Sequence, residues 1–332
     1  MLIAVIGAGA AGLTAAHRLQ QAGHQVAVFE ARPFVGGRTH TESFGPGHHL
    51  DTGAGWLTSA YTRTLALLDE LGMRERMHPL RASAPAELCV DGHSFNGAGQ
   101  PRVADEASPL VPTGEQQALH AWLRDLRQYP QDLSTRLEHD GESAEQHLAP
   151  VSPQAARYIF GPLFEGLFAP LAEQSAEFLR SWVASGRATY WQLDDGMDAP
   201  WKAVAAHLDV RLDEPVLSVR RAIGGLEVVS QRSSGLFDGV VVAAPPPVAA
   251  HAIERALTPP WYQAISYSGQ CRLYVARRGD GPPEPVHFRP LPMGLIASVE
   301  WQSGSLGAWG ACPPGTEWVL ICANQQHNNE LL

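Results

Sequence analysis

Residues 2–30 read LIAVIGAGAAGLTAAHRLQQAGHQVAVFE, and this stretch decides the fold. Its first five residues form a short apolar run that is typical of a buried parallel strand. Gly-Ala-Gly-Ala-Ala-Gly follows directly at residues 7–12, and residues 13–22 then predict a helix that ends at Gly23. A second apolar run at residues 25–29 ends in an acid. Strand, glycine turn, helix, strand and terminal acid in this order predict a βαβ unit that binds a dinucleotide.

Each glycine of this turn has a physical role. Gly7 allows the tight turn, Gly9 lets the backbone approach a diphosphate, and Gly12 lets the helix pack closely against the strand. The helix N-terminus, which includes Ala11, offers N–H groups and the positive end of the helix dipole to the phosphates. Glu30 lies 18 residues after Gly12, where a carboxylate accepts hydrogen bonds from both ribose hydroxyls. This pattern alone leaves NAD(P) and FAD both open.

The residues that follow narrow the choice of ligand. Residues 30–39, EARPFVGGRT, resemble the extended signature of the flavin-containing amine oxidoreductase superfamily, which includes monoamine and polyamine oxidases, protoporphyrinogen oxidases and phytoene desaturases. The resemblance implies FAD as the cofactor. It implies that Glu30-Ala31-Arg32 faces the AMP ribose and that Gly36-Gly37-Arg38 brings backbone and guanidinium to the pyrophosphate. For Arg32, an exposed surface position and an NADP 2′-phosphate contact stay open as alternatives.

A third match to the superfamily lies around residues 51–56, DTGAGW. Residues 39–43 and 48–50 predict a hairpin that leads into it, with His48 and His49 expected in a solvated turn. The family resemblance implies that Gly53-Ala54-Gly55 passes under the isoalloxazine ring. For Trp56, a position beside the flavin and an ordinary core position are both open.

Further along the chain the matches are looser. Residues 160–168 resemble a substrate-facing helix of protoporphyrinogen oxidases, although aromatic stripes at helical spacing are more often core. Residues 195–198, DGMD, match in part the Gly-Gly-Met at which family members return to the flavin domain. Val216 is the counterpart of a residue that holds the adenine through its backbone in the family, and a plain strand valine is the alternative. Residues 238–244 predict the returning strand of the nucleotide sheet, and residues 270–276, 295–300 and 317–323 predict strands of a second domain.

The predicted fold class is therefore α/β, with a Rossmann-type FAD-binding domain and an inserted helical and mixed-sheet substrate-binding domain. We expect the first domain to comprise residues 1–80 and 198–255, and the second residues 81–197 and 256–332. Family members are longer and carry a Gly-Asp strand end followed by a Ser-Gly helix start, which this sequence lacks; Gly279-Asp280 has no such helix after it. We therefore expect either an incomplete chain or a protein that holds FAD by its AMP half.

Composition excludes several classes of protein. The 332 residues are 45% hydrophobic and 17% charged, which is unlike a disordered chain, and 24 cations against 34 anions give a net charge of −10. That charge argues against binding to nucleic acid or to an anionic membrane surface. Four cysteines without a Cys-x-x-Cys pair suggest neither a zinc site nor a disulfide framework, and they favour a reduced, cytoplasmic compartment. No apolar stretch reaches the roughly 20 residues of a membrane span.

These observations predict an FAD-dependent oxidoreductase that takes hydride from a C–H or C–N bond of an apolar or amine small molecule. Residues 265–274 lack the lysine that amine oxidases typically carry there, which favours a protoporphyrinogen-oxidase-like substrate. No catalytic side chain is assigned, because no nucleophile elbow is present, and none of the 14 histidines has a metal-binding spacing. The alternatives are an NAD(P)-dependent dehydrogenase and a non-catalytic flavoprotein remnant. No oligomeric state follows from the sequence.

Overall fold

The computed structural model describes residues 1–45, 48–79, 87–90, 93–96, 98–101, 107–129, 138–185, 188–265, 267, 272–278, 287–288, 296–303, 310–311 and 316–323. The helices are α1 (Ala10–Gln21), α2 (Thr62–Glu70), α3 (Thr113–Asp125), α4 (Ala144–Leu148), α5 (Pro153–Ala155), α6 (Gly161–Leu167), α7 (Ala176–Ser185), α8 (Ala199–Ala205) and α9 (Pro246–Ala252). The strands of the first part are β1 (Leu2–Ile6), β2 (Gln25–Phe29), β3 (Thr41–Gly45), β4 (His48–Asp51), β5 (Leu57–Thr58), β6 (Met77–Pro79), β7 (Glu87–Val90) and β8 (His93–Asn96). The later strands are β9 (Tyr190–Leu193), β10 (Asp209–Arg211), β11 (Val216–Ala222), β12 (Gly225–Ser230), β13 (Ser234–Phe237), β14 (Gly239–Val242), β15 (Arg272–Arg278), β16 (His287–Phe288), β17 (Ile296–Ser303), β18 (Gly310–Ala311) and β19 (Thr316–Ala323).

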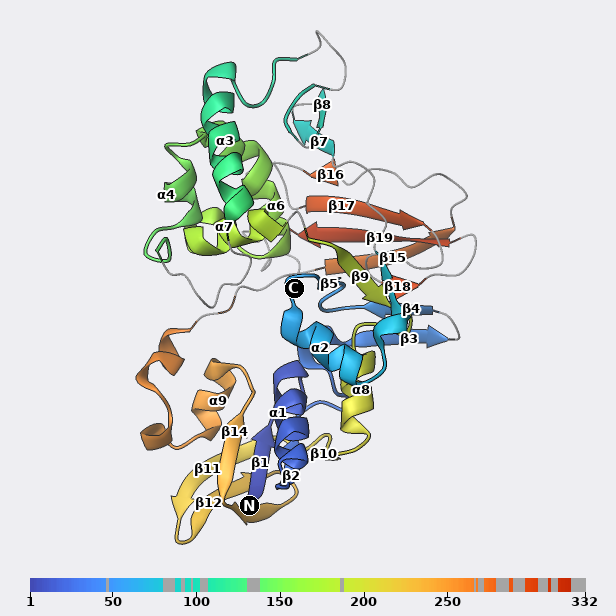
Figure 1. Ribbon diagram of the computed structural model, residues 1–332, viewed down its shortest axis with the longest axis vertical. Helices are drawn as coiled ribbons and strands as arrows, with labels where there is room; N and C mark the ends of the chain where they lie inside the picture. Colours follow the sequence, from blue (N-terminus) through green and yellow to red (C-terminus); the bar gives the residue numbers. More distant parts are fainter. Residues whose placement is uncertain are drawn as a thin grey trace.

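A parallel four-stranded sheet forms one end of the molecule, at the bottom of Figure 1, in the order β10-β2-β1-β14. Strand β1 pairs with β2 on one side and with β14, more than 200 residues away, on the other. Both faces of such a sheet are covered, which is why its two central strands β1 and β2 are mostly apolar and buried. The α/β fold with a Rossmann-type sheet that the sequence predicts is confirmed.

Side chains alternate between the two faces of this sheet, as the strand geometry requires. Val5 and Val28 are fully buried and pack towards helices α1, α2 and α8. Ala4 and Phe29 point the other way, onto the antiparallel sheet β11-β12-β13, where Phe29 meets Phe237 edge to face at 6.0 Å. Burial of a large apolar side chain stabilises the fold by about 1.5–3 kcal/mol, so this layered core anchors the ends of β1 and β2.

The rest of the chain builds a helical unit and a second large sheet, in the upper half of Figure 1. Helices α3, α4, α6 and α7 surround one apolar core in which Phe164 is fully buried and packs edge to face against Phe178 and Trp182. Phe164 is the central aromatic side chain of residues 160–168. Its burial agrees with the expectation that this segment forms part of a core, and not with a substrate-facing position. The large sheet has the order β15-β19-β17-β16-β7-β8, which joins the early hairpin β7–β8 to strands near the end of the chain.

The hairpin β3–β4 forms as predicted. His49, however, is only 8% exposed and lies in strand β4, so the expectation of a solvated turn is wrong for this residue. The strand places His49 beside the buried Asp51 rather than at the tip of the hairpin.

Within the described residues, no helix has the length and apolar character that crossing a membrane requires.

Gly12 provides a test of the close contact between α1 and β1. A Cβ at Gly12 would lie 1.9 Å from the carbonyl oxygen of Gly7, so Gly12→Ala forces the helix away from the strand. We expect a loss of about 1–3 kcal/mol in the free energy of unfolding, measured by denaturant titration. Gly114→Ala is the control, because nothing lies within 4 Å of its added methyl group, and it should leave stability unchanged or slightly raised. Equal stability of the two variants would contradict the contact.

Candidate functional site

The turn at residues 36–38 packs directly on the start of helix α1. Gly36 N–H donates to the Ala8 carbonyl over 2.9 Å, and Gly9 and Gly36 form a parallel β-bridge. A Cβ at Gly37 would lie 3.1 Å from the Cα of Gly9, and Gly37 has a left-handed φ of 59°, so glycine suits this close approach. The structure thus brings together the two glycine motifs that the sequence singled out, at the carboxyl edge of the parallel sheet.

This junction has the chemistry of an anion site. Helix α1 begins at Ala10, and among the described residues no side chain caps its N-terminus and no acid lies in its first turn. Its first N–H groups, which include that of Ala11, therefore present a positive dipole end outward. Arg38 is exposed on the adjoining turn and makes no ion pair with any residue that the structure describes. A bare helix N-terminus next to a turn that carries an exposed arginine fits a diphosphate.

Glu30 lies at the end of β2, next to this junction, and its carboxylate is held by backbone. Its Oε2 accepts from Ala8 N–H at 2.7 Å, and its Oε1 accepts from Arg32 N–H at 2.9 Å. Its own carbonyl accepts from Glu214 N–H at 2.8 Å. The carboxylate is therefore fixed at the strand end, with lone pairs left for a ligand. Val216 follows Glu214 by two residues, begins β11 and packs its side chain into the core beneath the sheet.

The neighbouring positions of the second strand end are exposed. Ala31 and Arg32 both face solvent, and the Arg32 guanidinium lies 5.7 Å from the centre of the Phe34 ring. The structure therefore places Arg32 over an aromatic ring, and its backbone rather than its side chain contacts Glu30.

The turn at residues 53–55 packs on the back of the Arg38 turn. Ala54 N–H donates to the Arg38 carbonyl at 2.9 Å, and a Cβ at Gly53 would lie 2.0 Å from the same oxygen. The Gly55 carbonyl accepts from the buried Gln192 amide at 3.1 Å. Trp56 is half-buried and meets Tyr190 edge to face at 6.5 Å, which places it against strand β9.

A buried polar network joins these turns, and sequence reasoning missed it. Asp51 and Asp198 are 1% and 0% exposed, and both bond to Thr41 at the start of β3. Burial raises the pKa of Asp51, an effect that hydrogen bonds from Met197 N–H and the Thr41 hydroxyl oppose and the nearby Asp198 carboxylate reinforces. The one local signal was the spacing of Asp198 and Lys202, the single lysine of the chain, which form an i,i+4 ion pair.

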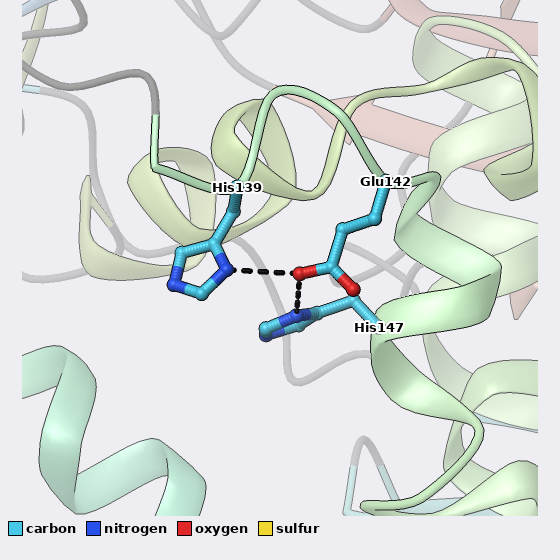
Figure 2. Close-up of side chains that lie close together, drawn as sticks. All are labelled: His139, Glu142 and His147. Carbon is cyan, nitrogen blue, oxygen red and sulfur yellow. Dashed lines mark hydrogen bonds and ion pairs between the residues drawn. The ribbon is translucent and has the colours of Figure 1, made fainter.

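Three side chains with metal-ligand chemistry meet in the helical unit (Figure 2). Glu142 Oε1 lies 2.8 Å from His139 Nδ1 and 2.8 Å from His147 Nδ1. His147 Nε2 accepts from Trp122 Nε1–H at 3.2 Å and lies 3.3 Å from an Arg180 nitrogen, so the imidazole proton sits on Nδ1. A metal bound at Nδ1 would displace that proton to Nε2, where it would face the N–H donors of Trp122 and Arg180. The arrangement therefore favours a hydrogen-bonded cluster of His139, Glu142 and His147 over a metal centre.

The hydrogen-bonded cluster of His139, Glu142 and His147 predicts that the stability of the protein depends on pH. Hydrogen bonds from His147 and then His139 hold the pKa of Glu142 below its usual range. A carboxyl group with a lowered folded-state pKa stabilises the protein above its unfolded pKa of about 4.3, and the contribution is lost as pH falls through the folded value. Because Glu142 is partly exposed, we expect Glu142→Gln to reduce stability at pH 7 by less than about 1 kcal/mol, with the difference vanishing near pH 3. Thermal unfolding checks this, with Glu173→Gln, an exposed acid, as the control; a difference that grows in acid would contradict it.

Comparison with known proteins identifies the family. Residues 10–271 match the family model of flavin containing amine oxidoreductases. Over 98 residues the chain is 43% identical to putrescine oxidase of Kocuria rosea, and over 74 residues it is 43% identical to protoporphyrinogen oxidase 2 of Arabidopsis thaliana. These alignments cover 29% and 22% of this chain, and they span only 20% and 14% of the two relatives' own lengths.

Solved structures agree on the fold. A structure of wild-type putrescine oxidase bound to putrescine superposes with a TM-score of 0.71 at 20% sequence identity, covering 100% of this chain and 78% of that one. At this level of identity the superposition establishes the fold alone. Because the family model covers more than half of the chain, the protein belongs to the flavin containing amine oxidoreductase family.

Proposed function

We propose that this protein is an FAD-dependent oxidoreductase that transfers hydride from a C–H or C–N bond of an apolar or amine substrate to the flavin. FAD is the cofactor of the family to which the chain belongs. The observation that carries the proposal is the contact of the residue 36–38 turn with the bare N-terminus of α1, beside the fixed Glu30 carboxylate. Those three features match a diphosphate followed by a ribose.

The AMP half of FAD accounts for the features at the sheet edge. The first N–H groups of α1 and the Arg38 guanidinium would hold the diphosphate, and Glu30 would accept hydrogen bonds from the ribose hydroxyls. The backbone near Val216 would hold the adenine. The full proposed contact set is Gly7, Gly9, Ala11, Gly12, Glu30, Ala31, Arg32, Gly36, Gly37, Arg38, Gly53, Ala54, Gly55, Trp56 and Val216.

The flavin end of the site would lie along residues 53–56. When bound, the isoalloxazine ring supplies the hydride acceptor, so the protein's part is to bind, orient and exclude water. The backbone at Gly53-Ala54-Gly55 carries little side-chain bulk, which suits close approach of a flat ring, and Trp56 would border it together with Tyr190. We assign no catalytic side chain. The lysine-free segment 265–274 lies only partly within the described residues.

A pyridine-nucleotide dehydrogenase is the weaker proposal. An NAD site would use the βαβ unit and Glu30, but it gives no reason for the glycine–arginine turn at residues 36–38 to pack on Gly9. It also leaves the turn at residues 53–55 without a role. Membership of a flavin-containing family supports FAD over NAD.

We also propose the domain division 1–80 with 198–255, and 81–197 with 256–332. Pairing of β14 with β1 supports the first unit, and pairing of β7 with β16 supports the second. We further propose a cytoplasmic location, supported by a sequence with four cysteines and no Cys-x-x-Cys pair. A small apolar substrate is supported by the lysine-free segment 265–274, which favours a protoporphyrinogen-oxidase-like substrate.

Cofactor titration of the purified chain tests the function. We expect a yellow protein with a flavin absorbance spectrum, or a colourless one that acquires that spectrum with added FAD but shows no binding of NADH. Reduction of the bound flavin by a panel of amines and a porphyrinogen, monitored at the flavin absorbance band, then sorts the substrate class. A folded protein that ignores FAD and binds NADH would contradict the proposal.

Glu30→Gln tests the ribose end of the site. The glutamine NH₂ group would face the N–H of either Ala8 or Arg32, so one backbone donor loses its acceptor and the ribose loses a charged partner. We expect the Kd for FAD to rise about 10- to 100-fold, from the 1.5–3 kcal/mol of a hydrogen bond to a charged group. Glu70→Gln, which removes only the surface ion pair with Arg18, should leave the Kd unchanged. Equal Kd values for both variants would exclude the role of Glu30.

A further inference from the structure

Resting on the proposed FAD site, we infer that Thr41, Asp51 and Asp198 form a positioning network that holds the diphosphate-binding turn in its binding geometry. None of the three side chains belongs to the proposed contact set. All three are buried, so their effect on the cofactor would pass through the turns that they connect.

The Thr41 hydroxyl is the centre of the network. It donates to Asp51 Oδ1 over 2.6 Å and accepts from Asp198 N–H at 3.2 Å. Thr41 N–H in turn donates to Asp198 Oδ2 at 3.1 Å, and Met197 N–H donates to Asp51 Oδ1 at 2.9 Å. Four hydrogen bonds thus join residues 41, 51 and 197–198, which lie up to 157 positions apart in the chain.

Each of the three segments leads directly into the candidate site. Thr41 comes three residues after Arg38, and Asp51 comes two residues before Gly53. On the third segment, the Cβ of Asp198 lies 3.1 Å from where a Cβ at Gly36 would be. The network therefore adjoins both the turn at residues 36–38, which Asp198 contacts, and the turn at residues 53–55, which follows Asp51 in the chain.

The turn at residues 36–38 needs such support. Gly36 and Gly37 both have left-handed backbone angles, with φ of 105° and 59°. Two glycines in succession lose much conformational entropy when fixed, and they cannot hold one geometry by themselves. Thr39 closes the turn locally, since its hydroxyl donates to the Gly36 carbonyl at 2.7 Å. The placement of the whole turn against α1 also depends on the residue that packs behind Gly36, and this residue is Asp198.

Charge compensation makes the buried carboxylates tolerable. Lys202 Nζ lies 2.8 Å from Asp198 Oδ1, and His40 Nδ1 lies 3.7 Å from Asp198 Oδ2. A buried carboxylate without such partners would be strongly unfavourable, whereas hydrogen-bonded and paired groups rigidify the segments that they join. Asp198 is thus anchored by two hydrogen bonds through Oδ2 and its own N–H and by the ion pair of Oδ1 with Lys202, although Oδ1 accepts no hydrogen bond from the described residues.

Thr41→Val is the direct test, because it keeps the shape of the side chain and removes the hydroxyl. We expect it to raise the Kd for FAD, measured by quenching of flavin fluorescence, at least tenfold. Thr41→Ser keeps the hydroxyl and should stay within about threefold of the parent protein. The Kd for ADP, which carries the diphosphate without the flavin, should rise by the same factor as that for FAD.

Ser152→Ala is the matched control for lost stability. Ser152 is also fully buried, and its hydroxyl likewise bridges a carboxylate (Glu115, 2.6 Å) and a backbone N–H (Ala155, 3.0 Å), but it lies in the helical unit. Thermal unfolding of both apo variants should show comparable losses, while only Thr41→Val weakens FAD and ADP. Should Thr41→Val fail to fold, Asp198→Asn, which removes the ion pair with Lys202, takes its place with the same expected direction.

The outcomes separate this inference from the proposed function. A parent protein that binds ADP but not FAD would refute the proposed function, and the ADP measurements would still decide the role of the network. Unchanged Kd values for FAD and ADP in a folded Thr41→Val variant would overturn the inference. So would an equal rise in Kd for Ser152→Ala, since that would trace the effect to stability alone.

Discussion

The contact between Gly9 and the turn at residues 36–37 is the constraint on which the rest of the candidate site depends. It places a glycine–arginine turn against the N-terminus of α1, where the backbone has unpaired N–H groups. Neither element makes an anion site of this kind alone: the helix end lacks a cation, and the exposed arginine lacks fixed donors. The junction favours glycine at residue 37, because a Cβ there would lie 3.1 Å from the Cα of Gly9 and the backbone is left-handed.

Three layers hold this junction in place. Helices α1, α2 and α8 cover one face of the parallel sheet, and the antiparallel sheet β11-β12-β13 covers the other (Figure 1). Because both faces of β1 and β2 are buried, the ends of these strands have little freedom to move, and the glycine turn and Glu30 inherit that rigidity. The carboxylate of Glu30 is then aimed by two backbone N–H groups rather than by a flexible side-chain partner.

Buried polar networks recur as the means of joining segments that are distant in the sequence. Thr41, Asp51 and Asp198 join the two turns to the start of α8. In the helical unit, Glu177 is 2% exposed and accepts from the Tyr129 hydroxyl and from His139 N–H. In both networks the carboxylates accept hydrogen bonds, and Asp198 is also paired with Lys202, which is the condition under which buried charge is tolerated. The first network is the one that we propose to support cofactor binding in this member of the flavin containing amine oxidoreductase family.

Local pattern was enough to predict the βαβ unit, the glycine turns, the position of Glu30 and the family, because each depends on residues within about 30 positions of one another. The hairpin β3–β4 followed from the same kind of short-range pattern. Local pattern misplaced His49, since only packing against the sheet decides which strand positions are buried.

Local pattern did not reveal the long-range contacts between polar side chains. No spacing rule relates Thr41 to Asp198, or Glu142 to Arg180 through His147. The sequence by itself determined which segments can turn tightly and carry a dinucleotide. Only the tertiary structure decided which buried carboxylates face one another, because the cost of burying a charge depends on partners that the folded chain alone brings within hydrogen-bonding distance.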